Sequence, residues 1–398
     1  MTIEPPIYLV MVEIRNETSE EERRNMAEYC VTGGTGFIAA YLVKSLLEKG
    51  CFVRTTVRDP GDAEKVGFLM ELAGAKERLK IMKADLTEDG SFDEAIRGVV
   101  GVFHTASPAT LIDPCIKGTL NVLRSCSKAS SVKRVVLTSS CSSIRYRFDV
   151  KKQQITSLDE SHWSDPEYCK RYNVLFYAYA KTVAEKEAWR VAKETGMDLV
   201  VVNPSFVVGP LLAPHPTSTL LLILAIVKGQ NITVTKSESD IHFALDAPKI
   251  DLLPIHFLLR DINLKLVLAM RPSSRALTQK DRSRMVAPGL RGEYPNTTVG
   301  FVHIDDVVAA HILAMEECKA SGRLVCSSSV AHWTQIIEML KAKYPSYPFE
   351  NKCSSQEGDN CAHIMETSKI QKLGFPAFKS VPEMFDDCIK SFQEKGFL

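Results

Sequence analysis

The segment Thr32-Gly-Gly-Thr-Gly-Phe-Ile-Ala39 constrains the fold of this chain most strongly, because it joins a short β-rich run to a helical one. Gly33 and Gly36 permit a tight turn there, and they let the backbone approach a pyrophosphate at the N-terminus of the following helix. A glycine pattern alone is a weak signal, but its position between a strand and a helix favours a nucleotide-binding loop over a plain turn. We therefore expect a nucleotide to bind beside the first strand.

Beyond this loop, short β-rich runs alternate with helical stretches. The alternation predicts an α/β fold with a doubly wound parallel sheet of the Rossmann type and helices on both faces. The expected strands are residues 29–32, 52–57, 79–84, 101–105, 134–138 and 199–203. We expect helices over residues 37–49, ended by Gly50, and over residues 177–193. Near residues 300–306 a strand should run into a helix capped by Asp305 or Asp306.

The composition excludes several classes of protein. The chain has 398 residues, 45% of them hydrophobic, and a formal net charge of +1, so it can bury a large core but offers no electrostatic basis for binding nucleic acid. Its apolar runs are shorter than the roughly 20 residues that span a bilayer, and its N-terminus lacks the basic region of a secretory signal. Its eleven cysteines form no Cys-x-x-Cys pair and no Cys/His cluster, which predicts reduced thiols, no zinc and a cytoplasmic location.

The residue after the second strand indicates which dinucleotide binds. An acidic residue there would hold a ribose 2′-hydroxyl, whereas here Arg58 comes first, and its guanidinium matches a 2′-phosphate. We therefore expect NADP(H), with Lys65 assisting, rather than a solvated surface arginine. Asp85 and Leu86, after the third strand, would flank the adenine. Residues 105–107 would line the cofactor at the carboxyl edge of the sheet.

A phenol and an ammonium group lie one helical turn apart at Tyr177 and Lys181. A lysine beside a tyrosine favours the phenolate and lowers a phenol pKa that is normally about 10, which suits an acid that protonates a carbonyl oxygen. Upstream, the fifth strand ends in Thr138-Ser-Ser-Cys-Ser-Ser143. These hydroxyls either bind a substrate carbonyl or satisfy the backbone groups of a turn.

The glycine loop, Arg58, Ser140, Tyr177 and Lys181 together resemble the extended short-chain dehydrogenases/reductases, and within them the plant dihydroflavonol reductase and cinnamoyl-CoA reductase group. The likeness covers residues 29–229 and 292–398. Within that group, residues 139–148, 163–171 and 203–212 resemble the tetraketide α-pyrone reductases, plant enzymes of sporopollenin synthesis in pollen exine formation.

The resemblance implies roles for individual residues. Ser140, with Ser139 as the alternative, would bind the substrate carbonyl, Tyr177 would donate the proton, and Lys181 would bind the nicotinamide ribose. Asn121 matches a family asparagine in the catalytic set, although a structural hydrogen bond explains it equally well. The complete set expected to contact the cofactor is Gly33, Thr35, Gly36, Phe37, Ile38, Arg58, Lys65, Asp85, Leu86, Thr105, Ala106, Ser107, Tyr177, Lys181, Pro204 and Val207. Arg145 and Tyr146 fall where relatives contact substrate, whereas His104, His162 and His303 are expected to be structural.

The chain departs from the family pattern in three places. Residues 1–25 are an extension expected to be disordered, and Met26 is a candidate start of the folded protein. The loop after Pro108 is shortened. Residues 230–288 lack a sustained period and are expected to be a mobile or poorly packed insertion. Residues 26–203 would then form the NADP-binding domain with the catalytic helix, and residues 204–398 mainly the substrate-binding region.

The expected function is NADPH-dependent reduction of a tetraketide α-pyrone ketone to the alcohol. One alternative is a dihydroflavonol or cinnamoyl-CoA reductase, although Phe176-Tyr-Ala-Tyr differs from the Asn-Trp-Tyr-Cys-Tyr typical of the cinnamoyl-CoA group. Another is a non-catalytic NADP-binding protein disabled by the insertion. The expected partners are a small-molecule polyketide or phenylpropanoid-like substrate and other enzymes of the polyketide pathway, with no nucleic acid and no membrane span.

Overall fold

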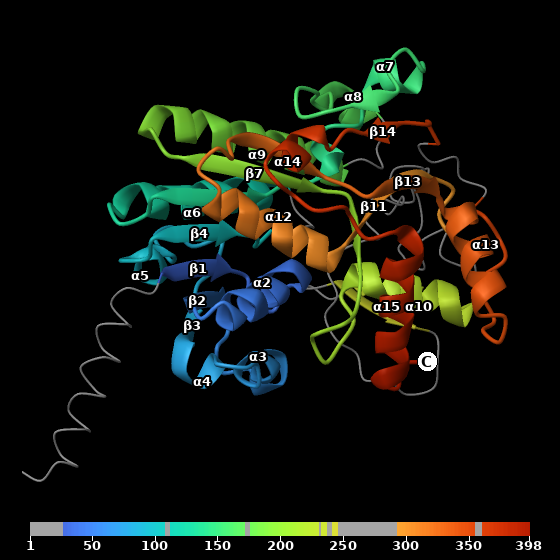
Figure 1. The fold of residues 1–398 in the computed structure, drawn as a ribbon, viewed down its shortest axis with the longest axis horizontal. Coiled ribbons are helices and arrows are strands. Elements are labelled where there is room, and N and C mark those ends of the chain that lie inside the picture. Colours follow the sequence, from blue (N-terminus) through green and yellow to red (C-terminus); the bar gives the residue numbers. More distant parts are fainter. Residues whose placement is uncertain are drawn as a thin grey trace, which may run out of the picture.

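A computed structural model describes residues 27–107, 112–171, 176–230, 232–236, 241–245, 293–354 and 360–398 (Figure 1). The expectations for residues 1–25, for the loop directly after Pro108 and for most of residues 230–288 lie outside these ranges. Among the described helices, none has both the length and the apolar character needed to cross a bilayer. Nor do the described residues contain a group of three or more His, Cys, Asp or Glu side chains arranged to hold a metal ion.

Seven parallel strands form the central sheet, in the spatial order β12-β7-β5-β4-β1-β2-β3. Their bounds are β1 Glu28–Thr32, β2 Phe52–Val57, β3 Leu79–Lys83, β4 Gly101–His104, β5 Arg134–Thr138, β7 Leu199–Pro204 and β12 Gly322–Cys326. Thr32 pairs with His104, which pairs with Leu137, so the carboxyl ends of the central strands lie side by side. Ligands of doubly wound sheets bind at such an edge.

Helices cover both faces of this sheet, as the alternating pattern predicted. Helices α2 (Phe37–Glu48) and α12 (Ile304–Glu316) pack on one face through an apolar cluster that includes Val31, Phe103 and Val136. Helices α5 (Asp93–Ile96), α6 (Ile112–Lys128) and α9 (Phe176–Thr195) pack on the other, around Val102 and Val135. Neighbouring strand residues therefore point into opposite cores, which explains the nearly continuous apolar composition of these strands.

A second layer of structure lies beyond the carboxyl edge. Its three-stranded sheet has the order β13-β11-β8, with bounds β8 Phe206–Val208, β11 Thr298–His303 and β13 Ser329–His332. Helices α10 (Ser218–Lys228), α13 (Trp333–Lys343) and α15 (Val381–Glu394) share its core, in which the rings of Phe206, Phe301 and Trp333 meet edge to face at 5.3–5.7 Å. These elements lie together on the right of Figure 1.

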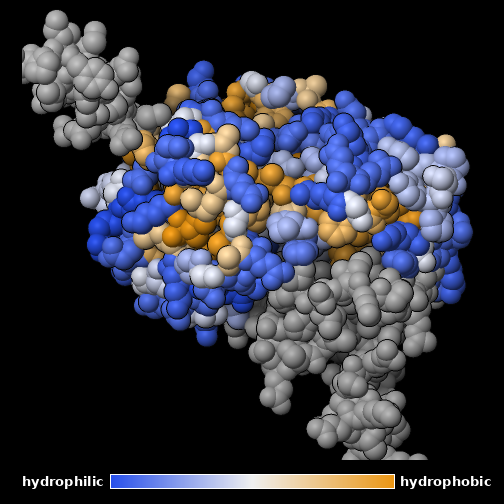
Figure 2. All heavy atoms as spheres, turned by 90° about the horizontal axis from the view of Figure 1, so that it is seen from below, coloured by the Kyte–Doolittle hydropathy of each residue, from blue (hydrophilic) through white to orange (hydrophobic). Residues whose placement is uncertain are grey.

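Short elements complete the described chain. They are α3 Ala63–Met70, α4 Ala75–Arg78, the 3-10 turn η1 Cys141–Ser143, α7 Phe148–Lys151, β6 Ser157–Leu158, α8 Pro166–Arg171, β14 Ile364–Met365 and α14 Ser368–Lys372. In the face seen from below, hydrophilic side chains surround smaller apolar patches (Figure 2).

The structure corrects one expectation and adds one element that was not predicted. Helix α12 begins at Ile304 and is capped by His303, whose Nδ1 accepts the Asp305 N–H at 3.0 Å, so Asp305 and Asp306 occupy the first turn rather than the cap. An imidazole nitrogen can fill the acceptor role of the usual Asp or Ser cap. Within residues 230–288, strands β9 (Ile232–Lys236) and β10 (Ile241–Leu245) form an antiparallel hairpin that the sequence pattern did not reveal.

Candidate active site

The glycine loop folds back on strand β2. The N–H groups of Gly33 and Gly34 donate to the main-chain oxygen of Thr56 at 3.0 and 2.9 Å, and Gly36 N–H donates to Gly33 O at 2.8 Å. Gly33 has φ +76°, and a Cβ on Gly34 would lie 2.3 Å from Thr55 Oγ1. Two adjacent glycines are therefore required, the first for its backbone conformation and the second for close packing.

Helix α2 starts directly after this loop. Gly36 is its N-cap and provides no side chain, and the first turn, within the described chain, contains no acidic residue. Its amides and the positive end of its dipole therefore point towards the carboxyl edge of the sheet, where they suit a phosphate. The expected contacts Thr35, Phe37 and Ile38 lie half-buried at this helix start.

Thr32 joins the glycine loop to the end of β4. Its Oγ1 accepts the N–H groups of Thr105 and Ala106 at 3.1 and 3.0 Å, and Thr105 Oγ1 donates to Thr32 O at 2.5 Å. With both lone pairs engaged, the Thr32 hydroxyl donates its proton to His104 Nδ1, 2.9 Å away. Thr105 and Ala106, two of the residues expected to line the cofactor, are thus held against the start of the glycine loop.

Arg58 and Asp85 lie beyond the ends of neighbouring strands β2 and β3. Arg58 is exposed. Partial burial would raise the pKa of Asp85, but hydrogen bonds from the Thr87 N–H and hydroxyl, together with the charges of Arg58 and Lys83, hold this pKa below its usual value. Lys65 is exposed and its Nζ binds Asp62 Oδ2 at 2.6 Å, so its charge already has a carboxylate neighbour.

Asn121 on α6 is bound on both sides of its amide. Its Nδ2 donates to Leu86 O at 3.0 Å, and its Oδ1 accepts from Arg124 Nη1 at 3.1 Å. This side chain therefore fixes the loop that follows β3, where Asp85 and Leu86 were expected to flank the adenine. The contacts correspond to the structural alternative for Asn121.

The two candidate serines at the end of β5 have different surroundings. Ser139 Oγ donates to the buried Glu185 Oε2 at 2.5 Å. Ser140 Oγ accepts the Ser142 N–H at 3.1 Å. Among the described contacts, the Ser140 hydroxyl acts as an acceptor alone, so its proton is available to a carbonyl oxygen. This difference favours Ser140 over Ser139.

Helix α9 brings Tyr177 and Lys181 to this strand end. Tyr177 is half-buried and Lys181 is buried, with Lys181 Nζ 5.9 Å from the centroid of the Tyr177 ring. The same Nζ donates to Thr138 O at 3.5 Å. The ammonium group therefore lies near both the Tyr177 ring and the end of β5, two residues before Ser140. Pro204 and Val207 lie buried and half-buried where β7 leads into β8.

The histidines have structural surroundings, as expected. Burial, assisted by the charge of Lys181, lowers the pKa of His104 to about 3, so this ring is neutral near pH 7. His162 Nδ1 lies 2.7 Å from Asp159 Oδ1. Arg145, which was expected near substrate, is buried and donates from Nη1 to Thr298 O at 2.6 Å, and its guanidinium lies 4.6 Å from the Tyr146 ring centroid.

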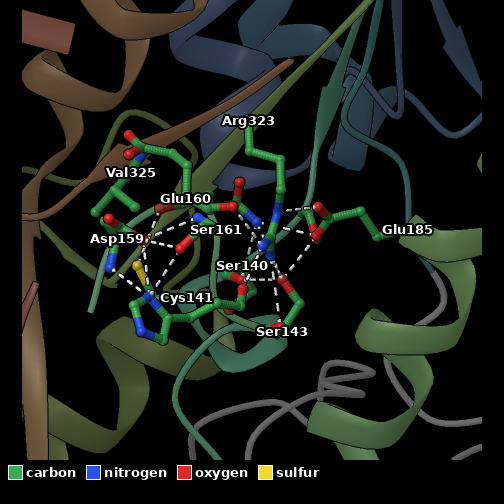
Figure 3. A network of polar contacts seen from close by, with 12 residues as sticks. Ser140, Cys141, Ser143, Asp159, Glu160, Ser161, Glu185, Arg323 and Val325 are labelled. Atoms are coloured by element: carbon green, nitrogen blue, oxygen red, sulfur yellow. Dashed lines mark hydrogen bonds and ion pairs between the residues drawn. The ribbon is translucent and has the colours of Figure 1, made fainter. Parts of the chain in front are cut away.

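The sequence patterns did not predict a buried ion pair that lies against Ser139 and Ser143. Glu185 Oε1 lies 2.6 Å from Arg323 Nε, and the two side chains are 0% and 6% exposed (Figure 3). Glu185 continues the helical face of Tyr177 and Lys181 at the same four-residue spacing, which was an available signal. Arg323 comes from the distant strand β12, and no local pattern connects it to this site.

Known proteins resemble this chain over most of its length. A model of the NAD dependent epimerase/dehydratase family matches residues 29–242. The chain is 59% identical over 384 residues to tetraketide alpha-pyrone reductase 2 of Arabidopsis thaliana, with 94% of this chain and 100% of that protein covered. It is 42% identical over 378 residues to tetraketide alpha-pyrone reductase 1 of the same plant, with 93% and 96% covered. Among solved structures, vestitone reductase from alfalfa superposes with a TM-score of 0.67 at 29% identity and covers 93% of this chain and 99% of its own.

The family match spans more than half of the chain, and these full-length relatives are all named reductases. The chain belongs to the NAD dependent epimerase/dehydratase family, and thus to the extended short-chain dehydrogenases/reductases, as an oxidoreductase that uses a nicotinamide adenine dinucleotide.

Proposed function

We propose that this protein reduces the ketone of a tetraketide α-pyrone to the corresponding alcohol with NADPH. The two Arabidopsis relatives that carry this activity in their names support the substrate class. The single structural observation that supports the chemistry is the convergence of Tyr177 and Lys181 on the end of β5, next to Ser140. When bound, NADPH supplies the hydride.

The cofactor would be held along the carboxyl edge of the sheet. The uncapped first turn of α2 and the loop amides suit its diphosphate. Arg58, exposed beyond β2, suits the 2′-phosphate, and the loop fixed by Asn121 suits the adenine. Residues 105–107, Pro204 and Val207 would line the nicotinamide half, with Lys181 on its ribose.

The proposed protein roles follow from the chemistry of each group. Ser140 donates its hydroxyl proton as a hydrogen bond to the substrate carbonyl and fixes its orientation. Tyr177 gives its phenolic proton to the carbonyl oxygen as that oxygen gains negative charge. The Lys181 ammonium stabilises the negative charge left on the phenol oxygen. The products are a secondary alcohol and the oxidised dinucleotide.

The test is NADPH oxidation by the purified full-length protein with a tetraketide α-pyrone ketone, in parallel with Tyr177→Phe. Loss of the phenol should reduce turnover by about a hundredfold or more while NADPH still binds. Full turnover by Tyr177→Phe would remove this residue from the mechanism.

The same assay separates the alternatives. A higher kcat/KM with a dihydroflavonol or a cinnamoyl-CoA thioester would reassign the substrate, because these compounds require the same hydride and proton transfers. Tight NADPH binding without turnover of any of the three would support the non-catalytic reading. A second protein that lacks residues 230–288 then tells whether that segment blocks the reaction.

Three further expectations belong to this proposal. Residues 26–203 would provide most of the cofactor site, and residues 204–398 most of the substrate site. The protein would act in the cytoplasm. It would also associate with other enzymes of the polyketide pathway, which co-purification from the native tissue can test.

A further inference from the structure

The buried side chain of Glu185 binds the serine loop, the segment of residues 139–143 that follows strand β5. Its Oε2 accepts from Ser139 Oγ at 2.5 Å, from Ser143 Oγ at 2.6 Å and from Asn203 Nδ2 at 3.0 Å. Asn203 Nδ2 also lies 3.2 Å from Ser140 O. Ser139, Ser143 and the carbonyl of Ser140 are therefore tied to one buried carboxylate or to its amide neighbour. Figure 3 shows the contact between Ser143 and Glu185.

The same helix carries the other two groups of the proposed chemistry. Tyr177, Lys181 and Glu185 occupy successive turns of one face of α9. Glu185 therefore lies two turns after Tyr177 on α9 and accepts hydrogen bonds from the Ser139 and Ser143 side chains, which flank Ser140.

Arg323 lies against the buried carboxylate of Glu185 and compensates its charge. Besides its 2.6 Å contact with Glu185, its Nη1 donates to Glu160 O at 3.1 Å and to His162 O, and its Nη2 donates to Ser143 Oγ at 3.0 Å. Its guanidinium stacks over the Trp163 ring at 3.8 Å from the centroid. Without this partner the Glu185 carboxylate would be a buried charge with no counter-charge, which strongly destabilises a folded protein.

We propose that Glu185, paired with Arg323, is a positioning residue for the reduction: it fixes Ser140 at the distance from Tyr177 that carbonyl binding and proton donation require. This inference rests on the proposed roles of Ser140 and Tyr177. Displacement of reacting groups by about 1 Å can reduce a rate by about a hundredfold, so a small change in this tether should reduce the rate of hydride transfer without weakening cofactor binding.

The test compares Glu185→Asp with Glu187→Asp in the full-length protein. Glu185→Asp keeps the buried charge but retracts it by one methylene. Glu187 lies on the same helix and pairs with the exposed Arg190 at 2.9 Å, so it receives the same chemical change away from the serine loop. One readout is hydrogen–deuterium exchange of residues 139–146 with NADPH bound. The others are the single-turnover rate with a tetraketide α-pyrone ketone and the Kd for NADPH.

We expect Glu185→Asp to speed amide exchange in residues 139–146 and to slow single turnover, each by about tenfold or more, with the Kd for NADPH unchanged within about twofold. Glu187→Asp should leave all three values at those of the unaltered protein. Unchanged exchange, or an unchanged turnover rate in folded Glu185→Asp, overturns the inference.

If Glu185→Asp does not fold, a milder variant still tests the inference. Ser143→Ala keeps both partners of the ion pair but removes the Ser143 hydroxyl, which contacts Glu185 Oε2, Ser140 O, Asn203 Nδ2 and Arg323 Nη2. It should slow single turnover by about fivefold. A rate equal to that of the unaltered protein overturns the inference. Tyr177→Phe keeps the two proposals distinguishable: if Tyr177→Phe is inactive and Glu185→Asp is fully active, the positioning role alone fails. If the unaltered protein does not reduce the ketone, the proposed function fails. Hydrogen–deuterium exchange of residues 139–146 then still tests whether Glu185 holds this segment in place.

Discussion

The ammonium nitrogen of Lys181 lies 3.5 Å from the main-chain oxygen of Thr138, which joins the middle of helix α9 to the last residue of strand β5. Through this contact a helix and a strand more than 40 residues apart deliver a phenol, an ammonium and a serine hydroxyl to one edge of the sheet. The arrangement leads to four predictions beyond those already given.

Arg58→Ala should weaken NADPH binding far more than NADH binding, because only NADPH carries the 2′-phosphate. A charge-assisted hydrogen bond of this kind contributes roughly 1.5–3 kcal/mol, or about 10- to 150-fold in affinity. Fluorescence titration with each dinucleotide measures the ratio. Lys65→Ala is the matched control, since Lys65 already pairs with Asp62 at 2.6 Å and should change the ratio less. An unchanged ratio in Arg58→Ala would refute the phosphate contact.

Gly34→Ala should destabilise the fold by roughly 1–3 kcal/mol, because its methyl group would lie 2.3 Å from Thr55 Oγ1 in a packed site. Gly67→Ala is the control. Gly67 lies inside helix α3, where a Cβ meets no atom within 4 Å, so alanine should stabilise the protein by up to about 1 kcal/mol. Urea unfolding measures both. Equal midpoints for the two variants would contradict the steric argument.

His104 and His311 should make the protein sensitive to acid. Burial lowers their pKa values to about 3 and about 4, from an unfolded value of about 6.5. The unfolded chain therefore binds protons first, and the stability that each neutral ring contributes above pH 6.5 is lost as the pH falls towards the folded pKa. Between pH 7 and about pH 5, each ring should lower the free energy of unfolding by about 2 kcal/mol.

Urea midpoints at the two pH values measure this loss. Replacing either histidine with asparagine should remove about half of it, and a pH dependence that survives in the double variant would assign it to other groups.

Asn121→Ala should raise the Kd for NADPH and leave the single-turnover rate at saturating NADPH nearly unchanged, because the amide holds Leu86 O in the loop proposed to contact the adenine. The loss of this half-buried hydrogen bond costs about 1 kcal/mol. If Asn121 instead belongs to a proton relay, the rate falls while the Kd stays constant. Measuring both constants on one preparation separates the two roles.

Local patterns predicted much of the fold. The expected strands agree with β1, β2, β3, β4, β5 and β7 within one residue at either end, because apolar runs between glycines and polar residues define buried parallel strands. The cap of α12 was wrong because a histidine took the role that acidic residues usually fill. The hairpin β9–β10 was missed although Ile232-Thr-Val-Thr-Lys236 alternates between apolar and polar residues, because this period is not sustained through the rest of residues 230–288.

Residues of the candidate site that belong to local motifs were predicted from the sequence, whereas contacts between distant segments were not. Tyr177, Lys181 and the serines belong to short motifs, so their spacing was readable. The resemblance already preferred Ser140 over Ser139, but the physical reason is the contact between Ser139 and Glu185, which joins residues 46 positions apart. The Arg323 partner lies a further 138 positions along the chain, and such pairings arise from tertiary packing alone.

Strand β12 has a consequence for biosynthesis. It pairs with β7 across more than a hundred intervening residues and brings the guanidinium that neutralises Glu185. A nascent chain that has emerged from the ribosome as far as α10 has all six other strands of the main sheet. Its Glu185 carboxylate still lacks the counter-charge of Arg323. Maturation of this enzyme must wait for the last quarter of translation.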